Sequence, residues 1–199
     1  MKRTRIRDIR HEELIEATIK TVHRRGFSDA TLSDIGAEIG APASSISYYF
    51  GSKAHLLEAT MQRLLQNLNA AMLEQYSAAE TPKDRLLAVV LANFDDRIFR
   101  TETCNVWMQF WAAAPYHPAL TRLHHINRKR VVSNFRAALR PMLPEQSRET
   151  ARSAIQYYMD GVWVEAGQSR RQLDAETART NAKAVVDLIL ATNISGDVA

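Results

Sequence analysis

Hydroxyl side chains and one lysine gather in the stretch "GAPASSISYYFGSKAHLL", residues 40–57. The group consists of Ser44, Ser45, Ser47, Tyr48, Tyr49 and Lys53. Hydroxyls are short hydrogen-bond donors and acceptors, and lysine adds positive charge, so the group suits contacts with DNA phosphates and base edges. A catalytic site would normally add an acid, a base or a metal ligand. An ordinary polar surface helix is the alternative interpretation.

Excess positive charge lies in the first ten residues. Five basic residues against one acidic residue give this segment a charge of +4, which equals the formal net charge of the whole chain. Basic arms of this kind commonly bind the phosphates of nucleic acid. Arg3 and Arg5 are therefore candidate DNA contacts, and a solvated terminus is the alternative.

The pattern of apolar residues is helical along almost the whole chain. Apolar side chains recur at spacings of three and four, which predicts an all-α fold. Helices are expected over 14–25, 32–39, 43–49, 53–77, 82–97, 101–114, 118–140, 145–168 and 175–192. Thr31 with Asp34 has the spacing of a capping box, and Ser52 can cap the helix from residue 53.

Three glycines mark the ends of the first three helices, at Gly26, Gly40 and Gly51. Short helices separated by a tight turn predict a helix-turn-helix, whose second helix enters the major groove. Ile35, Ile39, Ile46 and Phe50 are expected to form its small core. The predicted domains are 1–52, the arm and DNA-binding part, and 53–199, a helical effector-binding and dimerisation part.

The segment "TLSDIGAEIGAPASSISYYFGSKAHLLEAT" resembles the DNA-binding domain of TetR-family repressors, a likeness that covers about residues 8–60. Pro42 departs from the family pattern, where serine or threonine usually caps the helix. The resemblance implies an all-α repressor with an N-terminal helix-turn-helix domain and a C-terminal ligand-binding and dimerisation domain. It also implies DNA contacts from Thr31, Ala43, Ser44, Ser45, Ser47, Tyr48, Tyr49 and Lys53.

Aromatic residues are concentrated in two later segments, 93–123 and 156–167, which hold all three tryptophans. Two carboxylates, Asp160 and Glu165, lie close to the aromatic residues of the second segment. The faces of such rings attract a cation, so a pocket between these helices suits a quaternary ammonium ligand. Ordinary core packing is the alternative for each ring. The candidate ligand-binding residues are Phe94, Trp107, Phe110, Trp111, Tyr157, Tyr158, Asp160, Trp163 and Glu165.

The same region is similar to the choline-responsive members of the TetR family, which repress glycine betaine synthesis. The likeness rests on Phe94-Asp95, Trp107/Phe110/Trp111, Pro118/Arg122/Leu123, Ser133-Asn134 and Asp160-Gly161/Trp163. Glu165 departs from it, because a basic residue is expected there. The resemblance implies choline or betaine aldehyde as the effector, and a different cationic or hydrophobic small molecule is the alternative.

A repressor of this type is expected to act as a homodimer on double-stranded, palindromic operator DNA. The predicted dimer interface is a four-helix contact made by 145–168 and 175–192. Val162, Ala166, Ala178, Val185, Leu188 and Ile189 are the residues expected to line it.

Other classes of function lack support in the sequence. No nucleophile lies beside a base, and no histidine pair has a metal-binding spacing with an acid between, so neither an enzyme nor a metal or cofactor site is expected. No apolar run reaches the length of a membrane helix, and the one cysteine, Cys104, fits a reducing cytoplasm. A ligand-independent architectural DNA binder remains an alternative.

Overall fold

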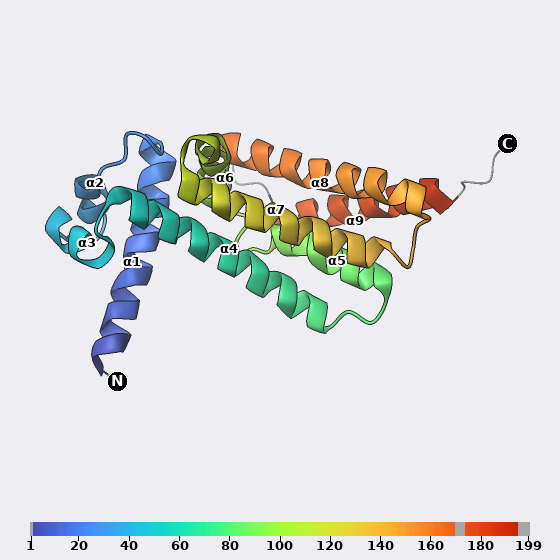
Figure 1. Cartoon of the computed structure of the whole chain (residues 1–199), viewed down its shortest axis with the longest axis horizontal. Coiled ribbons are helices and arrows are strands. Elements are labelled where there is room, and N and C mark those ends of the chain that lie inside the picture. Colours follow the sequence, from blue (N-terminus) through green and yellow to red (C-terminus); the bar gives the residue numbers. More distant parts are fainter. Residues whose placement is uncertain (1, 170–173, 195–199) are drawn as a thin grey trace.

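The computed structural model describes the backbone of residues 2–169 and 174–194 and the side chains of 10–169 and 174–192. That part of the chain holds helices and no strands, which confirms the predicted all-α class (Figure 1). None of its helices has the length and apolarity to cross a membrane. The helices are α1 Lys2–Arg25, α2 Leu32–Ala37, α3 Ala43–Phe50, α4 Lys53–Ser77, α5 Pro82–Leu91, α6 Thr101–Ala113, α7 Pro118–Leu139, α8 Glu145–Gln168 and α9 Ala175–Ile194, with short 3-10 helices η1 Ala92–Phe94 and η2 Ala114–Tyr116.

Two apolar cores underlie the two ends of the molecule. The helices α1, α2 and α3 lie at one end, and α4 runs from them along the bundle formed by α5–α9 (Figure 1). The smaller core includes Leu56 of α4, whereas Leu57 and Met61 of the same helix belong to the larger core. A domain boundary between residues 52 and 53 stays a prediction, since α4 and α1 serve both cores.

The ends of the first helices follow the predicted signals. Thr31 and Asp34 form a reciprocal capping box at α2, and the Ser52 hydroxyl accepts a hydrogen bond from the His55 N–H at α4. Pro42 precedes α3 in an extended conformation and makes no side-chain cap. Gly26, Gly40 and Gly51 have φ angles of 89°, 64° and 76°, a region that side chains other than glycine rarely adopt.

The basic arm is part of a helix. The backbone of α1 is helical from Lys2, so it extends well before residue 14, where the first helix was expected to begin. Arg3 and Arg5 thus lie in the first turns of α1, and their side chains lie outside the described residues. Their predicted contacts with DNA remain a prediction.

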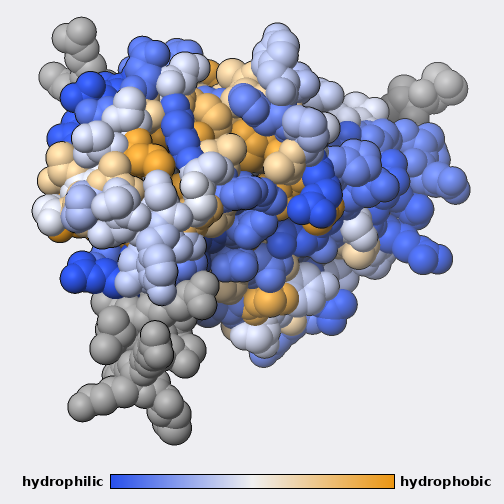
Figure 2. Space-filling view, turned by 60° about the vertical axis from the view of Figure 1, so that its left-hand side comes forward, coloured by the Kyte–Doolittle hydropathy of each residue, from blue (hydrophilic) through white to orange (hydrophobic). Residues whose placement is uncertain are grey.

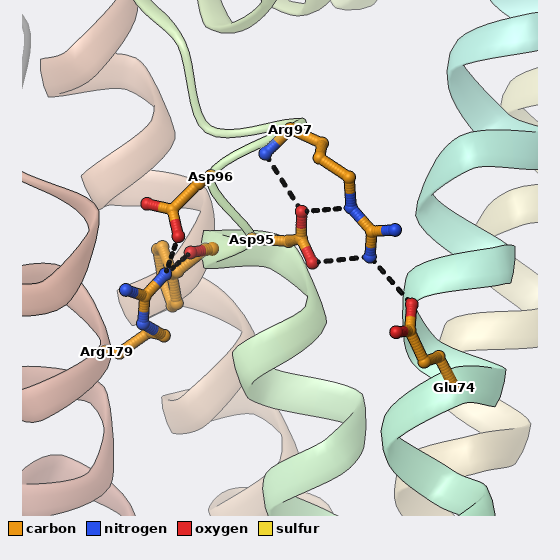
Figure 3. Close-up of polar contacts among 6 residues, drawn as sticks. Glu74, Asp95, Asp96, Arg97 and Arg179 are labelled. Carbon is orange, nitrogen blue, oxygen red and sulfur yellow. Dashed lines mark hydrogen bonds and ion pairs between the residues drawn. The ribbon is translucent and has the colours of Figure 1, made fainter.

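The helix expected over 82–97 ends earlier. α5 stops at Leu91 and η1 at Phe94, after which Asp95 is extended. Figure 3 shows the reason: Arg97 donates through its main-chain N–H and its guanidinium to the Asp95 carboxylate, and through Nη2 to Glu74 of α4. An aspartate that accepts from the backbone two residues later competes with helix hydrogen bonds. The Arg179 guanidinium completes the turn by donating to the Phe94 carbonyl at 2.7 Å.

Helix α6 ties the two ends of the molecule together through amide side chains. Gln109 Nε2 donates to the Val22 carbonyl of α1 at 3.2 Å, and its Oε1 accepts from the Phe27 N–H. Asn105, one turn earlier, donates to the Gly167 carbonyl of α8 at 3.1 Å. The same helix is therefore bonded to the DNA-binding end and to the bundle.

Candidate DNA-binding surface and effector cavity

Helix α3 has one buried face and one exposed face. Ile46 is fully buried and Phe50 nearly so, and both pack in the smaller core. Ser44, Ser47 and Tyr48 are exposed on the other side, at a spacing of three and four that places them on one helical face. Tyr48 is 80% exposed. Three hydroxyls on a short exposed helix give the donor and acceptor surface expected of a recognition helix.

The other predicted DNA contacts are less exposed or already make hydrogen bonds within the chain. The Thr31 hydroxyl is engaged in the capping box, where its donation to Asp34 keeps the pKa of that carboxyl below its usual value. Lys53 Nζ donates to the Ser28 carbonyl at 2.6 Å. Ala43, Ser45 and Tyr49 are half-buried, and the Tyr49 ring packs edge-on against His11 of α1. Figure 2, which brings this end of the molecule forward, shows a mainly hydrophilic surface with hydrophobic patches.

A residue not singled out from the sequence lies close to the recognition helix. Arg10 of α1 lines a groove together with the turn residues Gly40 and Ala41 and with Ser45 and Tyr49 of α3. Its guanidinium pairs with Glu13 at 2.8 Å on an exposed surface, where such pairs are weak and easily exchanged. Arg10 is thus a further candidate phosphate contact, whose only sequence signal was its place in the basic segment.

The second site is a small, partly open cavity lined by residues of α4, η1, α6, α7 and α8. Its volume is about 40 Å³, whereas ligand pockets usually measure about 300–1,000 Å³. A ligand therefore needs wall side chains to move. The lining residues are Leu68, Asn93, Trp107, Trp111, His124, Asn127, Arg128, Val131, Gln156, Met159, Asp160 and Trp163.

Three tryptophans form one side of this cavity, the candidate effector site, which is called the effector cavity below. Trp107 lies between the others, with ring centroids 5.8 Å from Trp163 and 6.2 Å from Trp111. Trp163 is fixed because its Nε1–H donates to the Asn93 carbonyl at 3.2 Å. Trp111 is only partly buried, so it is the ring that can move most readily.

Charged and polar groups face the tryptophans from α7 and α8. Arg128 Nη1 donates to Asp160 Oδ2 at 2.9 Å. Burial raises the pKa of the Asp160 carboxyl, and the nearby Arg128 charge opposes this shift. Burial and Arg128 together lower the pKa of His124, which stays neutral near pH 7. His124 Nδ1 and Trp107 Nε1 are buried and have no hydrogen-bond partner among the described residues.

Five of the nine predicted effector residues do not line the cavity. Phe94 and Phe110 are fully buried in the larger core, where Phe94 packs edge-on against Phe99 and Phe110 against Trp107. Tyr157 is 66% exposed, Glu165 is exposed, and Tyr158 packs against the core from outside. Tyr158 and Glu165 lie on other faces of α8 than Asp160 and Trp163, because each residue turns the helix by about 100°. Tyr157 is only one turn before Asp160, but its side chain is exposed. Trp107, Trp111, Asp160 and Trp163 do line the cavity.

Comparison with known proteins identifies the family of both parts of the chain. Residues 14–60 match the family of bacterial regulatory proteins called tetR, and residues 82–191 match the C-terminal domain of BetI-type transcriptional repressors. The regulator BetI of Burkholderia thailandensis is 35% identical over 192 residues, which cover 96% of this chain and 98% of the relative. The chain belongs to the TetR family. It is a TetR-type transcriptional repressor with a BetI-type C-terminal domain, and its relatives are regulators rather than enzymes.

One further relative and two solved structures extend the likeness. BetI of Paraburkholderia phymatum is 35% identical over 96% of this chain and 98% of the relative. A regulator from Saccharomonospora viridis, solved in complex with choline, superposes with a TM-score of 0.77 at 17% identity, over 90% of this chain and 96% of that one. A regulator from Pseudomonas aeruginosa PAO1 gives a TM-score of 0.71 at 24% identity, over 92% and 91% of the two chains. These structural likenesses concern the fold alone.

Half of the cavity residues missed in the sequence come from α7. Arg128 and His124 are four residues apart, so they share a helical face. That spacing was the only available signal, and the run of basic residues around it reads as a solvated helix. Asn93 and Gln156 gave no signal, because a polar residue at helical spacing is usually exposed.

TetR-family regulators bind operator DNA and small-molecule effectors and form dimers. Of the predicted interface residues, Ala166 and Ala178 are buried within the chain itself, so they cannot line a dimer contact. Val162, Val185 and Ile189 are partly buried, and Leu188 of α9 is 65% exposed. Tyr157 of α8 adds a second exposed apolar side chain on the helix pair expected to form the interface.

Proposed function

We propose that this chain is a homodimeric cytoplasmic repressor of genes for the conversion of choline to glycine betaine. It binds a palindromic operator and responds to choline or betaine aldehyde. One observation carries the effector part of the proposal: Trp107, Trp111 and Trp163 share a cavity with the Asp160 carboxylate. Aromatic faces and a carboxylate together are the groups that attract a quaternary ammonium ion.

The small polar end of such a ligand also has potential partners. A hydroxyl such as that of choline can accept a hydrogen bond and donate one. Trp107 Nε1–H and His124 Nδ1 are a buried donor and a buried nitrogen with no protein partner among the described residues. Unsatisfied polar groups in a cavity wall cost free energy that a ligand hydroxyl would recover.

The expected mechanism is a shift between two arrangements of the dimer. The effector alters operator affinity only by as much as it prefers one arrangement over the other. Since the cavity is too small for a trimethylammonium group, the arrangement with bound effector must differ in the position of at least one wall side chain. A change in the spacing of the two recognition helices, which ideally lie about 34 Å apart, would weaken operator binding.

The test is fluorescence anisotropy of a labelled palindrome from the DNA upstream of the gene for this protein, titrated with and without choline. Nanomolar, salt-dependent binding that choline weakens supports the whole proposal. Tight binding that is indifferent to choline and to betaine aldehyde keeps the repressor and rejects both as effectors. Binding no tighter than to random DNA rejects this promoter as an operator.

Tyr48 is expected to contribute directly to operator binding. The substitution Tyr48→Ala should weaken binding by about tenfold, because it removes a phosphate-directed hydroxyl and a ring worth roughly 1.4 kcal/mol together. The melting temperature should stay unchanged, since the side chain is 80% exposed. The same anisotropy assay measures the effect.

A matched control is available in Tyr116, an 81% exposed tyrosine of η2 outside the DNA-binding helices. Tyr116→Ala should leave operator affinity unchanged. Equal affinities for the two variants would remove Tyr48 from the proposed interface.

A further inference from the structure

The charges that line the effector cavity balance one another. Arg128 carries one positive charge, Asp160 one negative charge, and the lowered pKa of His124 keeps that ring neutral. A cation that enters without moving Arg128 would leave this partly enclosed site with a net positive charge. A ligand that carries both a cation and an anion would leave it balanced.

Arg128 has hydrogen-bond donors to spare. Only its Nη1 is bonded, to Asp160 Oδ2, and no other partner is present for its remaining N–H groups in the described part of the chain. A guanidinium presents five N–H donors in a planar fork that fits a carboxylate through two parallel bonds. The single bond to Asp160 therefore uses a fraction of what this side chain offers.

Other groups in the wall also present free donors. The buried Trp107 Nε1–H has no partner among the described residues. The amide oxygens of Asn127 and Gln156 already accept from Arg130 and Arg152, which leaves the N–H groups as the free half of each amide. Free donors beside a guanidinium favour an anionic oxygen ligand.

We propose that the cavity binds quaternary ammonium carboxylates, in which a trimethylammonium group is joined to a carboxylate by a short carbon chain, in preference to choline. The ammonium group lies against the tryptophans and Asp160, and the carboxylate takes the free donors of Arg128 and Trp107. Binding then replaces one ion pair by two and preserves the charge balance. This inference rests on the proposed function, because it concerns the same cavity and the same aromatic groups.

Isothermal titration calorimetry of the full chain with four probes tests the proposal: glycine betaine, choline, tetramethylammonium and acetate. Glycine betaine should bind about tenfold more tightly than choline, because it gains a charge-assisted hydrogen bond with Arg128. Acetate alone should bind weakly, since it lacks the group that the tryptophans attract.

The substitution Arg128→Met separates the two ligands. It should lower glycine betaine affinity by about 30-fold or more and leave choline affinity equal or higher, because Asp160 is then free for the cation. Arg128→Lys keeps the charge but not the planar fork. Its affinity for glycine betaine should lie between those of the original chain and of Arg128→Met. Arg136→Met is the matched control, because Arg136 also joins α7 to a carboxylate of α8, Glu149 at 3.3 Å, but lies on the exposed surface away from the cavity.

The outcomes distinguish this proposal from the proposed function. If choline binds as tightly as glycine betaine and Arg128→Met leaves their ratio unchanged, Arg128 selects no carboxylate and the inference is overturned while the proposed function stands. If none of the three quaternary ammonium probes binds, the inference is overturned together with choline as the effector, while the repressor part of the proposed function stands. The inference is supported when Arg128→Met reverses the order of the two ligands and Arg136→Met does not.

Discussion

Replacing Gly36 by alanine is expected to lower operator affinity by about 100-fold. A Cβ at this position would lie 2.2 Å from the Ala41 carbonyl oxygen, a backbone atom that cannot move without opening the turn between α2 and α3. The turn is held by hydrogen bonds from the Ile39 and Ala41 N–H groups to the Gly36 carbonyl. Overpacking of this severity costs about 3 kcal/mol, and each 1.4 kcal/mol is roughly a tenfold change in affinity.

The loss should be confined to DNA binding. Gly36 packs beside the smaller core, so effector binding measured by calorimetry should stay within about twofold of the original chain. Gly40→Ala is the matched control in the same turn, because its Cβ meets no atom within 4 Å and only its φ of 64° is unfavourable. That strain costs about 1–2 kcal/mol. Equal effects from the two variants would show that the contact with Ala41 is unimportant.

Replacing Gly167 by alanine is expected to destabilise the larger part of the molecule by about 2–3 kcal/mol. A Cβ here would lie 2.7 Å from Met108 Sδ and 2.9 Å from both the Asn105 nitrogen and the Cys104 carbonyl carbon. The latter two are backbone atoms, so α6 and α8 must separate. Urea unfolding followed by tryptophan fluorescence measures the change, because all three tryptophans lie on these two helices.

Gly161 provides the comparison within the same helix. A Cβ at Gly161 meets no atom within 4 Å, so Gly161→Ala should stabilise α8 by roughly 0.5–1 kcal/mol through helix propensity alone. The two variants should therefore change the unfolding free energy in opposite directions. A stabilised Gly167→Ala variant would mean that α6 and α8 do not pack as closely as the structure has them.

The helices could be predicted from the sequence because local chemistry specifies their ends. Thr31 with Asp34 and Thr81 with Asp84 form capping boxes whose residues are three apart, so the signals are readable without a fold. The early end of α5 could not be predicted in this way. Besides the local contact of Arg97 with Asp95, the turn is held by Arg97 reaching Glu74, a residue 23 positions earlier on a different helix.

The effector cavity was only partly predictable for a similar reason. Tryptophans stand out by type, so Trp107, Trp111 and Trp163 were identified with Asp160 nearby. Spacing on α8 could not show which face of that helix meets α6, so Tyr157 and Glu165 were included although they are exposed. Arg128 was missed because its relation to Asp160, 32 positions later, arises only when α7 packs on α8.

Opposite faces of α6 touch different parts of the molecule. Trp107 lines the cavity, whereas Gln109, two residues and about 200° further round the helix, is bonded to Val22 near the end of α1. A rotation of α6 that makes room for a ligand would therefore pull on α1. If α1 pivots at Val22 by about 5°, Lys2, roughly 30 Å away along the helix, moves by about 2.5 Å. A displacement of that size is comparable to a hydrogen-bond length, which is enough to separate a basic side chain from a phosphate.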